Sequence, residues 1–156
     1  MSVIIPCLNE EKFIGKALAN LAHQYPIEHY EIVVVDGGST DRTREVIDDF
    51  ISQHRNIDVL LVDNPARAIP HALNLGIAAA RGNIIARVDA HAAPSPGYIR
   101  RCVQVLERED VAVVGMPCSI QPGANTALAQ AIAMAVSHPF GIGDAKYRLD
   151  ANNSSS

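Results

Sequence analysis

Residues 31–41 read EIVVVDGGSTD, and this stretch decides the fold class. Its centre is a continuous run of β-branched residues, which is typical of a strand buried on both faces. Two glycines then turn the chain, after which Val46, Ile47, Phe50 and Ile51 fall on one face of a helix. A buried strand followed by an amphipathic helix is the repeating unit of a parallel α/β sheet.

The same alternation of short apolar runs and helical periods continues on both sides of this stretch. Further strands are predicted over residues 2–5, 58–62, 84–88 and 111–114. Helices are predicted over residues 10–24, 67–80 and 125–137, and around the apolar positions between 99 and 106. The strands are too apolar to face water, so the sequence predicts an α/β fold with a mostly parallel sheet and helices on both faces.

The composition fits one compact unit and argues against several functional classes. The chain has 156 residues, of which 48% are hydrophobic, enough for a real core. A net charge of −4 disfavours a nucleic-acid partner. Three widely spaced cysteines indicate neither a disulfide framework nor a zinc site, and they fit a cytoplasmic setting. We see no basic leader and no apolar stretch long enough to span a bilayer.

Ligands of parallel α/β sheets bind outside the carboxyl ends of the strands, and four successive strand ends carry polar clusters. The first cluster is residues 6–10, PCLNE. Its backbone N–H groups, with Asn9 at the start of a helix, can cradle an anion. The alternative is that Asn9 only caps the helix. Cys7 is interpreted as a small packed residue rather than a nucleophile.

The second and third clusters follow the strands that end near residues 36 and 62. Asp36 can accept hydrogen bonds from a base or a ribose, and Gly37 and Gly38 allow a ligand close to the backbone. A turn that merely caps the next helix is the alternative. Arg67 is expected at a helix start, an unfavourable place for a cation, which indicates an anionic ligand. Pairing of Arg67 with an acidic neighbour is the alternative there.

The fourth cluster is residues 87–91, RVDAH. Asp89 and His91 are two positions apart, so both can point to the same side of the chain and bind one divalent cation. A carboxylate with an imidazole suits Mn²⁺ as well as Mg²⁺, although imidazole is not a typical ligand of Mg²⁺. The alternative is a turn with a solvated histidine.

These clusters, in this order and spacing, resemble the family 2 glycosyltransferases of the GT-A fold over residues 2–148. The segments that carry the resemblance are residues 2–11, 31–41, 64–76 and 87–91, the last of which aligns with the family's Asp-x-Asp metal motif. The Asp-Ala-His variant and the Asn-Pro-Ala-Arg segment at 64–67 are most similar to bacterial exopolysaccharide (succinoglycan-type) glucosyltransferases.

The resemblance implies a Rossmann-like nucleotide-sugar-binding fold and inverting transfer of a sugar, most often from a UDP-linked donor. The acceptor implied is a saccharide or lipid-linked molecule in polysaccharide biosynthesis. The nucleotide-binding residues carried over are Pro6, Cys7, Asn9, Glu10, Asp36, Gly38, Arg67 and Asp89. Asp89 and His91 are carried over as ligands of a divalent cation, Mn²⁺ or Mg²⁺. His91 stands where the family usually has an aspartate, which leaves the identity of the metal open.

The resemblance also implies that the donor-binding domain, placed over residues 1–150, is incomplete and stops before the acceptor half. A disordered tail is expected over residues 151–156. The family's general base is expected beyond this chain, so no catalytic residue is named, and Asp144 and Asp150 are candidates only as late carboxylates. The chain lacks the tryptophan usual in a later family motif. An uncovered sheet would favour a homo-oligomer, and a longer parent enzyme could lie at the inner face of the membrane.

Three alternatives to an active transferase come from other functional classes. A non-catalytic nucleotide-binding fragment is consistent with the missing general base. A nucleotidyltransferase would carry a glycine-rich loop with Lys or Arg after its first strand, which residues 6–10 lack. An NAD-dependent oxidoreductase would carry the spaced-glycine fingerprint, which is also absent.

Overall fold

The computed structural model describes residues 1–24, 30–115 and 126–127. The chain divides into two compact units, residues 1–103 and residues 104–156. The four strands and the first three helices found among the described residues belong to the first unit. The helix predicted over residues 125–137 lies, apart from residues 126 and 127, outside the described residues, as do residues 144 and 150–156. The domain predicted over residues 1–150 therefore stays a prediction.

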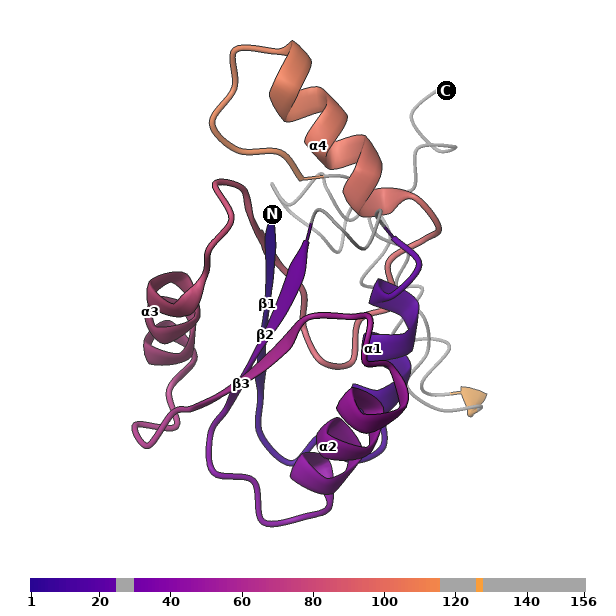
Figure 1. The fold of residues 1–156 in the computed structure, drawn as a ribbon, viewed down its shortest axis with the longest axis vertical. Coiled ribbons are helices and arrows are strands. Elements are labelled where there is room, and N and C mark those ends of the chain that lie inside the picture. Colours follow the sequence, from indigo (N-terminus) through magenta and orange to yellow (C-terminus); the bar gives the residue numbers. More distant parts are fainter. Residues whose placement is uncertain (25–29, 116–125, 128–156) are drawn as a thin grey trace. The chain divides into compact units, whose positions relative to one another are not determined.

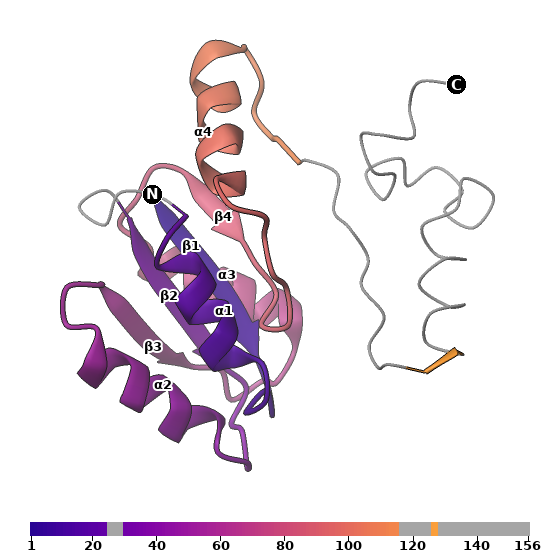
Figure 2. The same cartoon turned by 90° about the vertical axis from the view of Figure 1, so that its right-hand side faces the viewer.

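The first unit is built on a parallel sheet in which strands and helices alternate along the chain (Figure 2). The strands are β1 (Ser2–Cys7), β2 (Glu31–Asp36), β3 (Val59–Asp63) and β4 (Ile85–Arg87). The helices are α1 (Ile14–Leu21), α2 (Thr43–Gln53), α3 (Ile69–Ala79) and α4 (Tyr98–Arg108). The strand order is β3-β2-β1-β4 and every pair is parallel, which confirms the predicted fold class.

Helices cover both faces of the sheet, with α1 and α2 on one side and α3 on the other (Figure 1). Successive side chains of β1 point to opposite faces of the sheet, so they pack against different helices. Val3 and Ile5 pack in the core with Leu18 of α1, whereas Ile4 packs with Ala72 of α3. A Cβ added to Gly76 of α3 would lie only 2.5 Å from the Cγ2 methyl of Ile4, so a glycine is needed for this close approach.

The strand order creates one point where the direction of winding reverses. The chain steps outward from β1 to β2 and β3, and then crosses back to place β4 on the opposite side of β1. The carboxyl ends of β1 and β4 therefore lie side by side with their loops diverging. Crevices of this kind are where doubly wound sheets bind their ligands.

Strand β1 runs to Cys7, two residues beyond the predicted end before Pro6. The amide of Ser2 donates to the carbonyl of Ile84 and the carbonyl of Ile4 accepts from Val88, so the even positions of β1 face β4. Pro6 shares this orientation, but the pairing with β4 ends at Ile4. The missing N–H of Pro6 therefore costs the sheet no hydrogen bond.

The strand predicted over residues 111–114 was wrong. Within the described part of the chain these residues pair with no other strand, and the amide of Val111 instead donates to the carbonyl of Glu109 at 2.8 Å. An apolar β-branched run forms a strand only where a neighbouring strand accepts its backbone hydrogen bonds. None of the helices in the described ranges is long and apolar enough to cross a bilayer.

Candidate functional site

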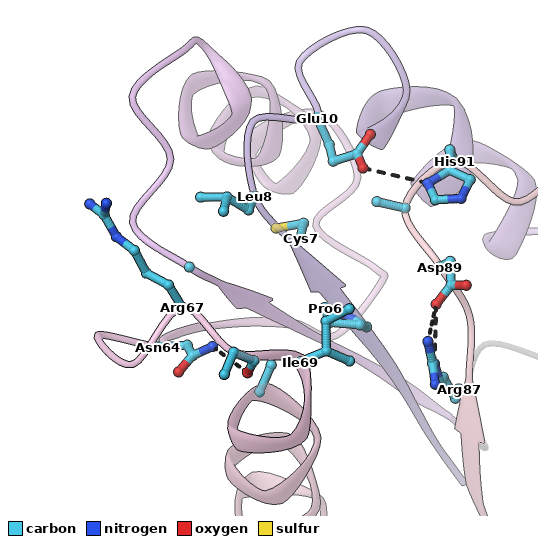
Figure 3. Close-up of a pocket in the computed structure, with 14 residues that line it drawn as sticks. Pro6, Cys7, Leu8, Glu10, Asn64, Arg67, Ile69, Arg87, Asp89 and His91 are labelled. Atoms are coloured by element: carbon cyan, nitrogen blue, oxygen red, sulfur yellow. Dashed lines mark hydrogen bonds and ion pairs between the residues drawn. The ribbon is translucent and has the colours of Figure 1, made fainter.

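A pocket of about 310 Å³ opens at the point where the winding reverses (Figure 3). Its walls come from the loop after β1, the loop between β3 and α3, and the loop after β4. Its size is within the range of small-molecule sites. Six of the predicted site residues line it: Pro6, Cys7, Glu10, Arg67, Asp89 and His91.

Asp89 is held in the pocket by Arg87, the last residue of β4. The Nε and Nη2 atoms of Arg87 donate to the same oxygen, Oδ1 of Asp89, at 3.1 and 3.0 Å. Both side chains are about half exposed, at 50% and 44%. The spacing of two residues at a strand end places both side chains on one side of the chain, where they line the same pocket.

His91, in the loop after β4, lies next to the loop after β1. Its Nδ1 atom is 3.5 Å from Oε1 of Glu10, so the pair connects the loops that follow β1 and β4 (Figure 3). The described residues contain no cluster of three or more metal-ligating side chains. A cation bound by Asp89 and His91 would take its remaining ligands from water and from the bound molecule, as cations at phosphate sites commonly do.

Arg67 brings a second guanidinium to the pocket. Its backbone has a φ of 56°, and α3 begins two residues later at Ile69, so the prediction that Arg67 starts the helix was wrong. A Cβ added to Gly38 would lie 3.5 Å from Nη2 of Arg67, so the side chain passes the turn after β2. No acidic side chain in the described ranges pairs with Arg67. Its charge is available to an anionic ligand.

Asp36 is fully buried and does not line the pocket. Its carboxylate accepts hydrogen bonds from the backbone N–H and the hydroxyl of Ser39, and Nη1 of Arg44 lies 3.0 Å from its Oδ2. The Cys7 thiol donates to its Oδ1 at 3.8 Å. In this structure Asp36 therefore shapes the turn after β2, and its predicted contact with a nucleotide stays a prediction.

Asn9 and Gly38 also lie outside the pocket lining. The Oδ1 atom of Asn9 accepts the Thr40 N–H at 2.8 Å, and its own N–H donates to the Ser39 hydroxyl at 2.9 Å. The interpretation of Asn9 as a helix cap was wrong, because its φ of 56° turns the chain and the N-cap of α1 is Phe13. Asn9 instead joins the loop after β1 to the turn after β2.

The Cys7 thiol is not poised for nucleophilic chemistry. Burial, with the neighbouring Asp36 carboxylate, raises the pKa of Cys7 to about 12. The thiol is therefore protonated at neutral pH, and the thiolate is the reactive form. This agrees with the interpretation of Cys7 as a packed residue.

The lining residues that were not predicted as site residues include four with larger side chains: Leu8, Asn64, Ile69 and Arg87. The side chains of Leu8 and Ile69 are apolar yet 42% and 55% exposed, and they give the pocket an apolar wall. Asn64 is buried, and its Oδ1 has no hydrogen-bond partner among the described residues. Leu8, Asn64 and Arg87 carried a sequence signal, because each stands in a segment at a strand end, whereas Ile69 belongs to a helix.

Comparison with known proteins shows the family. The sequence model described as Glycosyl transferase family 2 matches residues 2–153. The chain belongs to glycosyl transferase family 2. Among members of this family, succinoglycan biosynthesis protein ExoA of Rhizobium meliloti is 31% identical over 153 residues, which are 96% of this chain and 44% of ExoA. The predicted resemblance to succinoglycan-type proteins is thereby confirmed.

Two solved structures are similar in fold to this family 2 chain. The mannosyltransferase PcManGT of Pyrobaculum calidifontis, in complex with GDP-Man and Mn²⁺, has a TM-score of 0.68 and 30% identity, over 87% of this chain and 39% of PcManGT. The glucosyl-3-phosphoglycerate synthase of Mycobacterium tuberculosis, in complex with Mn²⁺, UDP and glucosyl-3-phosphoglycerate, has a TM-score of 0.53 and 25% identity, over 70% of this chain and 40% of the synthase. The fold is Rossmann-like GT-A. The chain spans less than half the length of the curated relatives it matches.

Proposed function

We propose that this pocket is the donor site of an inverting glycosyltransferase that transfers a sugar from a UDP-linked donor. The acceptor proposed is a saccharide or a lipid-linked molecule in polysaccharide biosynthesis. One observation carries the proposal: Asp89, His91 and the unpaired Arg67 line a single pocket at the winding reversal of a family 2 chain. We also propose that the parent enzyme lies in the cytoplasm, at the inner face of the membrane, and that it forms a homo-oligomer.

The residues of the pocket suit the charge that this reaction develops. The bond between the sugar and the β-phosphate breaks, and negative charge accumulates on the leaving diphosphate. A divalent cation, when bound, supplies Lewis-acid stabilisation of that charge. Arg67 adds a cationic side chain at the same pocket, and preorganised positive charge of this kind stabilises the transition state.

Asp89 and His91 fit such a cation, because one carboxylate and one imidazole in a shared pocket leave open positions for phosphate oxygens. We propose Mn²⁺ rather than Mg²⁺, since imidazole is a poor ligand for Mg²⁺. Both solved structures compared above contain Mn²⁺.

A base that deprotonates the acceptor hydroxyl is required for an inverting transfer. Among the described residues, the carboxylates that line the pocket are those of Glu10, which is paired with His91, and Asp89, which is paired with Arg87. For the described residues we therefore assign donor binding alone. A nucleotide-binding chain that transfers no sugar by itself is the second candidate, and measurable transfer by this chain would contradict it.

The donor nucleotide is tested by titrating the chain calorimetrically with UDP and with GDP, each in Mn²⁺ and in EDTA. UDP is expected to bind more tightly than GDP in Mn²⁺, and both are expected to weaken in EDTA. Tighter binding of GDP, the nucleotide part of the GDP-Man in the mannosyltransferase complex, would overturn the choice of UDP. Absence of binding by both nucleotides in Mn²⁺ would overturn the donor site itself.

A further inference from the structure

Arg87 is a pocket residue to which the proposed function gives no role. It ends β4, and its side chain is turned toward Asp89 (Figure 3). Both of its contacts go to one oxygen of Asp89, at 3.0 and 3.1 Å. The third nitrogen of its guanidinium group, Nη1, makes no contact with Asp89, so the group keeps donors for another anion.

The pair between Arg87 and Asp89 is suited to exchange. Both side chains are about half exposed, and ion pairs in such surroundings contribute little to stability. Arg87 engages only Oδ1 of Asp89, but a divalent cation bound to either oxygen of this carboxylate would lie close to the guanidinium group, and the two positive charges repel one another. Metal binding at Asp89 therefore favours a structure in which Arg87 has found another anion.

A diphosphate can satisfy both requirements at once. One set of its oxygens can complete the coordination of the cation, and another can accept the fork of N–H groups that an arginine presents to phosphate. A nucleoside monophosphate has fewer oxygens within reach of both partners. The geometry thus links three events: release of Asp89 by Arg87, occupation of Asp89 by the cation, and capture of the diphosphate by Arg87.

We propose that Arg87 is a diphosphate-binding residue that Asp89 holds in the free protein and that moves to the donor's phosphates when the metal and nucleotide bind. The proposal rests on the proposed donor site. It makes the binding of Mn²⁺ and UDP mutually dependent, because each ligand removes an obstacle to the other. Such a coupling acts equally in both directions.

The test compares wild type with Arg87→Gln, Arg87→Lys and Arg55→Gln by calorimetry. Arg55 is exposed and lies outside the pocket. Arg55→Gln removes the same positive charge as Arg87→Gln and is therefore the matched control. Each protein is titrated with Mn²⁺ alone, and with UDP and UMP at a fixed Mn²⁺ concentration. Circular dichroism and thermal melting establish that the variants are folded.

In Arg87→Gln, the affinity for Mn²⁺ alone is expected to rise about threefold, because a weak exposed ion pair no longer competes for Asp89. The affinity for UDP in Mn²⁺ is expected to fall about tenfold, the scale of a charged hydrogen bond, with a smaller change for UMP. Arg87→Lys is expected to recover part of the preference for UDP, and Arg55→Gln is expected to match wild type.

An unchanged preference for UDP over UMP in Arg87→Gln, with wild type binding UDP normally, would overturn the role of Arg87 and leave the donor site standing. An equal loss in Arg55→Gln would also overturn it, because the effect would then be one of net charge. A wild-type chain that binds neither UDP nor UMP in Mn²⁺ would overturn the donor site and this proposal together.

Discussion

Replacing Asp89 with alanine is expected to lower the affinity for UDP in Mn²⁺ by at least about tenfold, because loss of even an outer-shell partner costs a metal site about that much. The affinity measured in EDTA is not expected to fall, since the variant also frees Arg87 from its ion pair. Calorimetry of both proteins in both buffers measures the difference.

Asp48→Ala is the matched control for this substitution. Asp48 is exposed on α2 and does not line the pocket, and its replacement by alanine removes the same negative charge. It is expected to bind UDP as wild type does in both buffers. Equal affinities of wild type and Asp89→Ala for UDP in Mn²⁺ would remove Asp89 from the site.

Asp36→Asn is expected to lower the free energy of unfolding by about 2–4 kcal/mol, the cost of disrupting a buried charged network. The carboxylate is fully buried and accepts from the Ser39 N–H, the Ser39 hydroxyl and Arg44. An amide would present donors where these groups need an acceptor. Urea unfolding followed by circular dichroism measures the change.

The neighbouring Asp63 offers a control that uses the same arginine. Its Oδ1 atom lies 2.6 Å from Nη1 of Arg44, but its side chain is 74% exposed. Asp63→Asn is therefore expected to cost at most about 1 kcal/mol, as exposed ion pairs do. If both variants lost the same stability, burial of Asp36 would not be what anchors the turn after β2.

The sheet was predictable because its strands carry a local signal. The β-branched run of residues 31–36 gave the bounds of β2, and the helices α2 and α3 followed from apolar positions on one face. The errors lie where tertiary contacts decide. Pro6 continues a central strand because its missing donor faces the side where β4 has ended, and residues 111–114 find no described partner strand.

The candidate site was predictable where residues follow strand ends, because the carboxyl ends of parallel strands meet at one edge. Glu10, Asp89 and His91 were brought together in this way. Residue type alone could not distinguish polar residues that line the pocket from polar residues that stabilise the neighbouring loops. Asn9 and Asp36 carry suitable polar groups, yet in the fold these groups bind the turn after β2.

The most direct measurement is a crystal structure of the chain with UDP and Mn²⁺. The metal is predicted to be bound by Asp89, with the diphosphate in the pocket between the loops after β1 and β4 and within reach of Arg67 and Arg87. A nucleotide bound elsewhere on the sheet, or a metal with no bond to Asp89, would contradict the assignment of this pocket as the donor site.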